Sequence, residues 1–480
     1  LVNDKNTDSE LFTYIVTAHK PTAVSITICG HFTSSRRKNL IIAKANRIEI
    51  YKLTKDGIEP ILEQILYGRI ATMELIDLNN VNSASGGNYA TNISTKQISG
   101  FDFDDDDDDD DDNDDEDLLQ KLVVVTEDKY QLAVLSYDKK TNTIKTISSG
   151  DVSDLTGRPV EQGMIGSIDC QSRIIGLHMY DGLMKFIPFD KRGNLLQEFN
   201  ANLNELKVLD FCFLKNNNSG AETTFDNENV KTNNNTNNNN AAVSSLTRSI
   251  NRENGGESSA VDGLMMSSMP VIAVLHKDVK DERHVSTYRV NLKDRDLEPG
   301  PFEHREVEQG SKKLLPISSS IGGGCLVVGE ETICYLNEVS KTQQTTAQTT
   351  AMTMDDEGNN NNTMNNASDK RVNFSTSPSS SLIRALSTPS SLMYSSSCLI
   401  PSDGTNVLMD RFLIADEDGD LYLLVLSKQH QQEQQRGAAA AGVVDRTTRA
   451  STKLAFERLG KTSSAAAISY LDNSVAFIGS

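Results

Sequence analysis

Carboxylates that alternate along a short stretch can converge on one hard cation, and Asp416-Glu417-Asp418-Gly419-Asp420 is such a stretch. An EF-hand calcium loop needs glycine at its sixth position and a bidentate glutamate at its twelfth. Here Gly419 comes fourth, and the apolar run from Leu421 to Leu426 follows at once. The spacing therefore favours a hairpin turn, and no metal site is predicted.

A glycine run, Gly322-Gly323-Gly324, precedes an apolar run, as in loops that cradle phosphate. Neither a Lys-Ser/Thr pair nor a helical pattern follows it, so we interpret it as a strand entry. The seven histidines are scattered, and the motifs GxSxG and HExxH do not occur. We therefore expect no catalytic residues, no cofactor and no enzymatic activity.

The charge balance argues against direct contact with nucleic acid. The 480 residues carry a formal charge of −20, and 14 of the 67 acidic residues lie between 102 and 117. Basic residues cluster only at Arg36-Arg37-Lys38, so the basic stripe that follows a phosphate backbone is missing. No apolar run reaches the roughly 20 residues of a membrane span, so no membrane contact is expected.

Four low-complexity segments interrupt the chain, at residues 79–117, 216–262, 340–396 and 428–451. Their Asn, Ser, Thr, Asp and Gln tracts cannot bury enough apolar area to fold, so we expect disordered inserts. We interpret the Asp tract as a solvated loop, with a docking tract for a basic partner as the alternative. The rest consists of short apolar runs that alternate or are continuous, which predicts an all-β protein.

A repeat of two apolar runs around a tight polar turn becomes visible once the inserts are removed. It occurs seven times, the last as a half copy, at residues 39–53, 121–137, 173–189, 270–292, 324–336, 411–426 and 474–480. Asp181-Gly182 and Asp418-Gly419 supply the positive-φ turn chemistry between strands.

The repeat spacing predicts a seven-bladed β-propeller whose last blade is incomplete. About 45 residues per repeat remain outside the inserts, which is the span of one four-stranded blade. We expect a flexible N-terminus at 1–11 and a single propeller at 12–480 with the inserts as loops. A pair of β-sandwiches is the alternative. Leu1, where an initiator Met would stand, suggests a fragment.

Several long segments resemble, in order, the first propeller of the large subunit of the damage-specific DNA-binding protein. They are TAHKPTAV (17–24), GHFTS (30–34), NLIIAKANRIEIY (39–51), YGRIATMEL (67–75), GRPVEQGMIGSID (157–169), RIIGLHMYDGLMKFIPFD (173–190) and YLDNSVAFIGS (470–480). The resemblance covers nearly all of the chain outside the inserts and none of the inserts. It implies a protein of three propellers and a C-terminal helical domain, of which this chain holds the first propeller.

The resemblance also implies a function. That family is the adaptor of cullin 4 type ubiquitin ligases, and its first and third propellers grip substrate receptors, typically through a short receptor helix. The cullin would bind the second propeller, and damaged DNA would be reached only through a partner subunit. Roles in ubiquitination and DNA repair, in nucleus and cytoplasm, are expected. The alternative is a three-propeller subunit of a splicing or 3′-end cleavage complex that binds nucleic acid.

The same resemblance assigns a receptor-binding role to one loop. The segment Asp154-Leu155-Thr156-Gly157-Arg158-Pro159 is similar to the family's cleft-facing loop, so Arg158 is the expected receptor contact and Gly157 and Pro159 shape the loop. Family members often have a second Arg where Leu155 stands, which implies a different receptor contact there. A solvated Arg158 without a partner is the alternative.

The turn of the second hairpin provides two further candidate contacts, Lys129 and Tyr130. An exposed Tyr offers amphipathic contact area at a low entropy cost. The alternative is that Tyr130 packs on its own blade.

Overall fold

The computed structural model describes twelve stretches of the chain. They are residues 19–54, 57–77, 119–154, 157–190, 192–205, 207–215, 269–338, 384–388, 392–401, 408–430, 450–472 and 474–480. All regular elements within these stretches are strands. In the part of the chain that the structure describes, no helix could span a membrane. The predicted flexible segment 1–11 lies outside the described residues, as does most of each predicted insert.

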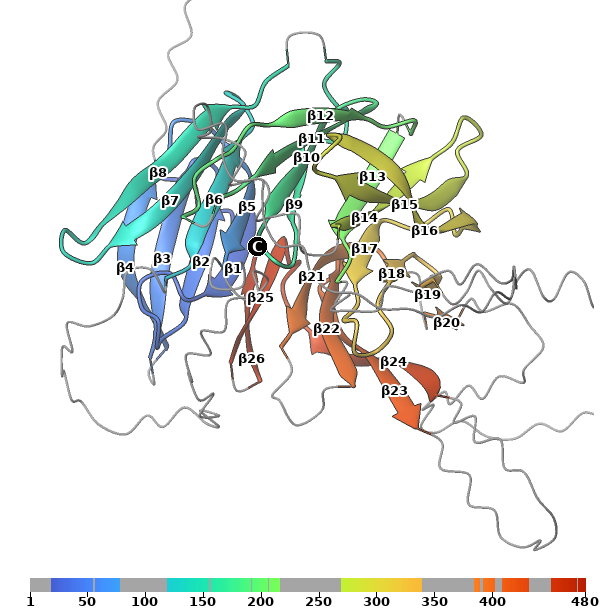
Figure 1. Cartoon of the computed structure of the whole chain (residues 1–480). Coiled ribbons are helices and arrows are strands. Elements are labelled where there is room, and N and C mark those ends of the chain that lie inside the picture. Colours follow the sequence, from blue (N-terminus) through green and yellow to red (C-terminus); the bar gives the residue numbers. More distant parts are fainter. Residues whose placement is uncertain are drawn as a thin grey trace, which may run out of the picture.

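Six four-stranded antiparallel sheets and one two-stranded sheet follow one another around a centre (Figure 1). The first three sheets are β1 (Ile26–Gly30), β2 (Asn39–Lys44), β3 (Arg47–Thr54) and β4 (Gly57–Ile65); β5 (Ile70–Ile76), β6 (Lys121–Thr126), β7 (Gln131–Asp138) and β8 (Thr143–Asp151); and β9 (Ile165–Ile168), β10 (Ile174–Tyr180), β11 (Leu183–Pro188) and β12 (Phe199–Asn202). The next three are β13 (Lys207–Phe213), β14 (Val271–Lys277), β15 (Arg283–Asn291) and β16 (Asp296–Val307); β17 (Lys313–Pro316), β18 (Cys325–Val328), β19 (Thr332–Leu336) and β20 (Arg384–Ser387); and β21 (Tyr394–Ile400), β22 (Met409–Asp416), β23 (Asp420–His430) and β24 (Ala450–Lys461). The two-stranded sheet is β25 (Ala467–Asp472) and β26 (Val475–Gly479).

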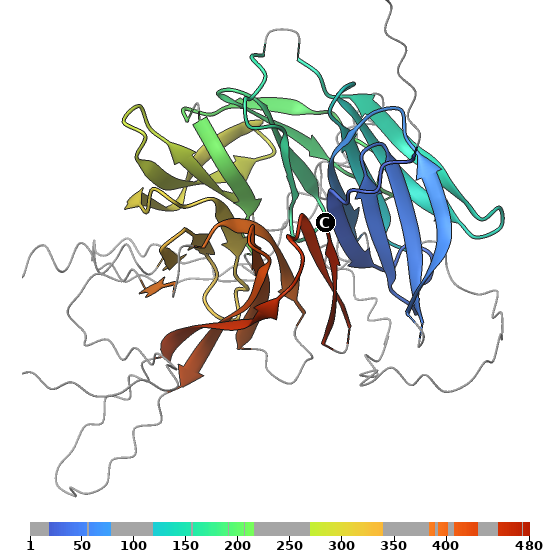
Figure 2. The same ribbon diagram turned by 180° about the vertical axis from the view of Figure 1, so that it is seen from behind.

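The first strand of each sheet lies nearest the centre, and the fourth strand, where present, lies outermost (Figure 1). The two-stranded sheet sits between the sixth and the first sheet, because β25 contacts both β21 and β1. Figure 2 shows this junction from behind, with β25 and β26 beside the first sheet. The arrangement is a β-propeller with six complete blades.

The apolar core is divided among the spaces between adjacent sheets. One cluster joins the second and third blades through residues such as Val123 and Ile175, and equivalent clusters follow around the ring. The two-stranded sheet is held from both sides, by Ile42 with Leu471 and by Leu413 with Ile468. Apolar contacts therefore run from blade to blade around the whole ring.

This packing explains the two kinds of apolar run in the sequence. A strand inside a blade is covered on both faces by neighbouring blades, so it is apolar without interruption. All four residues from Leu40 to Ala43 in β2 are at most 2% exposed. An outermost strand such as β8 is exposed or half-buried along its whole length and is accordingly polar.

The hairpin turns agree with the prediction. Gly182 and Gly419 have φ angles of 71° and 84°, and both stand in two- or three-residue turns between strands. Asp416 accepts hydrogen bonds from the Asp420 amide at 2.7 Å and from the Tyr422 hydroxyl at 3.3 Å. The stretch from Asp416 to Asp420 is therefore the turn of a hairpin.

The sequence prediction and the structure differ in the bounds of two inserts. The predicted insert 428–451 overlaps the last residues of β23 and the first residues of β24. The predicted insert 340–396 ends too late, because β20 and the first residues of β21 lie inside it. In β21 three Ser residues follow Tyr394, and the four-residue β20 leaves no periodic pattern. The seventh repeat forms a two-stranded sheet, in line with the predicted incomplete last blade, and a seven-bladed ring stays a prediction.

Candidate protein-interaction face

The order of the strands divides the loops of the propeller between two opposite faces. Because the strands in a blade alternate in direction, the hairpin between its second and third strands lies on the same face as the connection to the next blade. Backbone hydrogen bonds join these loops: the Leu66 amide donates to Asn46 at 2.8 Å, the Val152 amide to Tyr130 at 2.8 Å and the Thr462 amide to Gly419 at 2.7 Å. We call this side the linker face.

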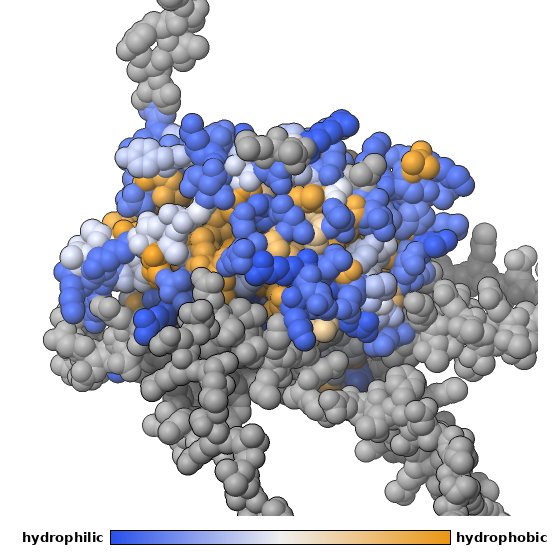
Figure 3. All heavy atoms as spheres, turned by 45° about the horizontal axis from the view of Figure 1, so that its top comes forward, coloured by the Kyte–Doolittle hydropathy of each residue, from blue (hydrophilic) through white to orange (hydrophobic). Residues whose placement is uncertain are grey.

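The long low-complexity segments belong to the other side, which we call the insert face. Residues 78–118 and 216–268 join first to second strands, and residues 339–383 and 431–449 join third to fourth strands. Both kinds of loop start and end on the insert face. Each long segment therefore leaves and re-enters the propeller there. Figure 3 shows one side of the molecule, where the coloured surface is mostly hydrophilic and apolar residues gather across the middle.

Arg158 lies on the linker face, in the connection between β8 and β9, with its side chain 74% exposed. Its guanidinium pairs with Glu161 at 3.2 Å and with Asp181 at 3.5 Å. The Asp181 amide also donates to the Arg158 carbonyl oxygen at 2.9 Å. The arginine is thus positioned by the adjacent β10–β11 hairpin and still reaches solvent.

Tyr180 contacts several residues of the loop that carries Arg158. Its hydroxyl accepts a hydrogen bond from the Asp154 amide at 2.9 Å, and Pro159 forms an isolated β-bridge with it. A Cβ atom on Gly157 would lie 2.5 Å from the Tyr180 ring, so only glycine allows this approach. Asp154 in turn accepts a hydrogen bond from Asn200 at 3.0 Å. Four of the predicted site residues are therefore brought together around one buried ring.

The other two predicted residues lie in the β6–β7 turn, where Tyr130 is half-buried and Lys129 is exposed. Tyr130 is half-buried with φ at 47°, and its ring stacks on that of Tyr180 with centroids 5.9 Å apart. Lys129 is exposed, and its ammonium makes no hydrogen bond or ion pair with the described residues. The loop thus holds Tyr130 as a support for Tyr180 and leaves Lys129 free on the surface.

Two exposed apolar residues on the same face escaped the sequence analysis. Ile65, the last residue of β4, is 59% exposed, and Tyr67, in the connection to β5, is 99% exposed. In the sequence they belong to an ordinary apolar run, and nothing in that run distinguishes exposed residues from buried ones.

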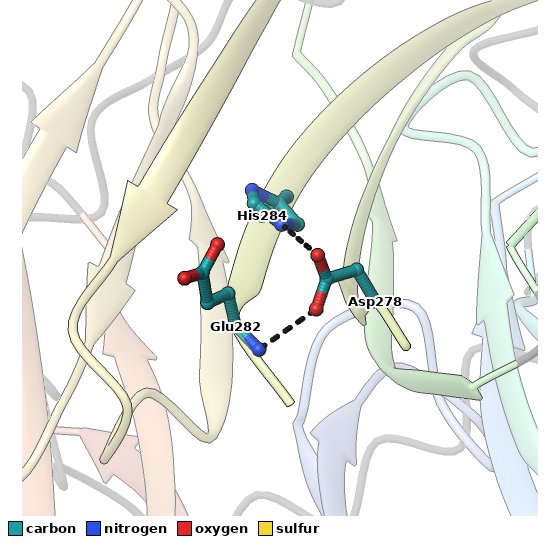
Figure 4. A group of neighbouring side chains, drawn as sticks. All are labelled: Asp278, Glu282 and His284. Carbon is teal, nitrogen blue, oxygen red and sulfur yellow. Dashed lines mark hydrogen bonds and ion pairs between the residues drawn. The ribbon is translucent and has the colours of Figure 1, made fainter. Parts of the chain in front are cut away.

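Within the described residues, the ligand atoms of Asp278, Glu282 and His284 lie within 4.8 Å of one another, close enough to hold a cation (Figure 4). The hydrogen bonds favour a different role. His284 Nδ1 accepts the Glu306 amide at 3.1 Å, so in the neutral ring the proton is on Nε2, 3.6 Å from Asp278. Asp278 also accepts the amides of Lys280 and Glu282 at 2.8 and 2.9 Å. Burial raises the pKa of the Asp278 carboxyl, but these hydrogen bonds outweigh burial and lower it. We assign the group to the turn between β14 and β15.

Comparison with known proteins finds related propeller proteins along nearly the whole chain. A family model described as the RSE1/DDB1/CPSF1 first beta-propeller matches residues 23–236 and 229–480. The chain is 31% identical over 98% of its length to DNA damage-binding protein 1 of Oryza sativa subsp. japonica. It is also 31% identical, over 97% and 98% of its length, to DNA damage-binding proteins 1a and 1b of Arabidopsis thaliana. The chain spans 29% of the length of these relatives.

Proposed function

Because the chain belongs to the family of RSE1/DDB1/CPSF1 first β-propellers, we propose that it is the receptor-binding propeller of a non-catalytic ubiquitin ligase adaptor. The match to DNA damage-binding protein 1 over nearly the whole chain carries this proposal. In the proposed complex a cullin 4 type protein binds elsewhere on the polypeptide, and damaged DNA is reached through a partner subunit. The adaptor serves ubiquitination and DNA repair, in nucleus and cytoplasm.

Substrate receptors bind, in this proposal, to the linker face around Arg158. The Arg158 guanidinium is held by Glu161 and Asp181 but is still exposed to solvent. Its remaining N–H groups can donate to a carboxylate or to the C-terminal carbonyls of a receptor helix. The strand ends that flank the long low-complexity segments lie on the insert face. Loops on a rigid scaffold are the usual place for such contacts.

We also propose that the full-length protein completes the seventh blade of the ring. The outer edge of β26 has no partner strand among the described residues, and Ser480 accepts the Val24 amide at 3.2 Å on the linker face. We propose that further strands of the full-length polypeptide complete the blade, the first of them paired with the outer edge of β26.

The function is tested by replacing Arg158 in the full-length protein. Arg158→Glu should lower the recovery of co-purified substrate receptors about tenfold or more, because it removes the donor fork and adds a third carboxylate beside Glu161 and Asp181. The amount of co-purified cullin should not change. Both are measured by quantitative mass spectrometry of the purified complex.

Two controls make this result specific. Arg192→Glu changes an exposed arginine on the insert face and should leave receptor recovery as in the wild type. Arg158→Ala should act in the same direction as Arg158→Glu but more weakly. Equal loss of cullin and receptors would contradict the assignment of Arg158 to receptor binding.

Three-propeller RNA-processing subunits are the second candidate class, because the matching family model also covers RSE1 and CPSF1. Micromolar binding of single-stranded RNA with a steep salt dependence would favour this second class.

A further inference from the structure

We propose that Ile65, Tyr67 and Lys129 form a second contact surface on the linker face, which binds a segment of a partner protein that carries an apolar side chain next to an acidic one. This inference rests on the proposed function, since it assumes that the linker face binds proteins. We call these three residues the Tyr67 surface.

The first observation is the exposure of two large apolar side chains on either side of a half-buried one. Leu66 packs into the cluster between the first and second blades, while Ile65 and Tyr67 on either side of it are 59% and 99% exposed. An aromatic ring in water contributes nothing to folding, whereas buried under a partner it contributes more than most side chains.

The second observation is that the backbone beneath Tyr67 is fixed. The Leu66 and Ile70 amides donate to Asn46 and Ala45, both at 2.8 Å, which ties the connection to the β2–β3 hairpin. On the other side of Tyr67, the Arg69 amide donates to Asp128 at 3.1 Å, and the Glu127 amide donates to Arg69 at 2.8 Å. Little backbone freedom is therefore lost when a partner binds, which favours affinity.

The third observation concerns charge. In the β6–β7 turn that is bonded to this connection, Glu127 pairs with Arg69 at 3.6 Å, and Asp128 accepts the Arg69 amide. Lys129 alone among the charged residues of the turn makes no hydrogen bond or ion pair with the described residues. An unpaired ammonium on a turn that is bonded to the connection carrying Ile65 and Tyr67 is complementary to a carboxylate near an apolar residue.

The position of the surface fits the same partner. The Val152 amide bonds Tyr130 in this turn, and Val152 leads directly into the loop of Arg158. The Tyr67 surface and Arg158 therefore lie on neighbouring loops of one face, and a single partner chain can reach both. A two-point contact raises affinity and selects partners that carry both features.

The test begins with a photocrosslinker. The full-length protein carries p-benzoylphenylalanine at position 67, and the crosslinked peptides are sequenced after ultraviolet irradiation in cells. We expect one recurring segment of another protein in which an apolar residue adjoins Asp or Glu. Crosslinks only to later residues of the same polypeptide, or to no protein, would overturn the proposal.

A synthetic peptide of the crosslinked segment is then titrated against the full-length protein by calorimetry. Tyr67→Ala should weaken its binding about 30-fold and Lys129→Glu about tenfold, the latter with a reduced dependence on salt. Val279→Ser changes a fully exposed apolar residue elsewhere on the linker face, and Ile58→Ser changes a 40% exposed residue on the insert face, so neither should alter binding. An affinity unchanged by Tyr67→Ala would also overturn the proposal.

The two proposals can fail separately. If the crosslinked protein binds through the Tyr67 surface but neither it nor a cullin co-purifies as part of a ligase, the surface stands and the ligase function fails. If receptors and cullin co-purify but no receptor crosslinks at position 67, the function stands and the surface fails.

Discussion

Replacing Asp210 by alanine should lower the free energy of unfolding by about 2–3 kcal/mol, because it leaves the buried Leu314 amide without its acceptor and removes the partner of the half-buried Lys313 ammonium. Asp210 is 3% exposed on β13, and it accepts the Lys313 ammonium at 2.9 Å and the Leu314 amide at 2.8 Å. Both donors are on β17, the first strand of the next blade. The attraction of Asp210 outweighs burial and raises the pKa of Lys313. The variant leaves this cation and a backbone amide without their acceptor.

Urea denaturation of the full-length protein, followed by the fluorescence of a dye that reports exposed apolar surface, measures the loss. Asp420→Ala is the matched control, since Asp420 pairs with Arg458 at 2.6 Å but Arg458 is 54% exposed. That surface pair should contribute at most about 1 kcal/mol. A loss for Asp210→Ala as small as for Asp420→Ala would show that the blades do not depend on this tie.

Lowering the pH from 7 to 4 should cost the propeller about 3 kcal/mol of stability through His178 alone. This side chain is 1% exposed, and neither ring nitrogen has a hydrogen-bond partner among the described residues. Burial lowers the pKa of His178 from 6.5 to about 4, against a weaker opposing effect of Asp181. A histidine whose pKa is depressed on folding binds its proton in the unfolded state first. Its stabilising contribution is therefore complete above pH 6.5 and is lost as the pH falls toward 4.

The comparison of wild type with His178→Leu isolates this effect. At pH 7 the variant should be as stable as the wild type or more stable, because it removes two buried polar atoms without partners. At pH 4 its advantage should be larger by about 3 kcal/mol. A titration of the His178 ring in NMR spectra with a midpoint near 6.5 would contradict this explanation.

Much of the fold follows from local sequence patterns. The hairpins could be predicted because strands covered on both faces are continuously apolar, and because turns such as Asp181-Gly182 demand a residue with positive φ. The short strand β20 could not, since it lies in a Ser- and Thr-rich stretch and owes its place to pairing with β19.

The candidate site shows a similar division. The resemblance pointed to Arg158, and its neighbour Glu161 lies three residues away in the sequence. Its second partner, Asp181, and the ring of Tyr180 beneath the loop come from the next hairpin, so only the folded chain brings them together. Tyr67 could not be selected from an apolar run, because exposure depends on the direction of each side chain from a twisted backbone.

The most direct test of the central claim compares two forms of the full-length protein, the wild type and a form without residues 1–480. Each is purified from cells, and its partners are quantified by mass spectrometry. We predict that the truncated form keeps the cullin and loses the substrate receptors. Receptors retained after the deletion, or RNA-processing subunits in place of a cullin in both samples, would contradict the account.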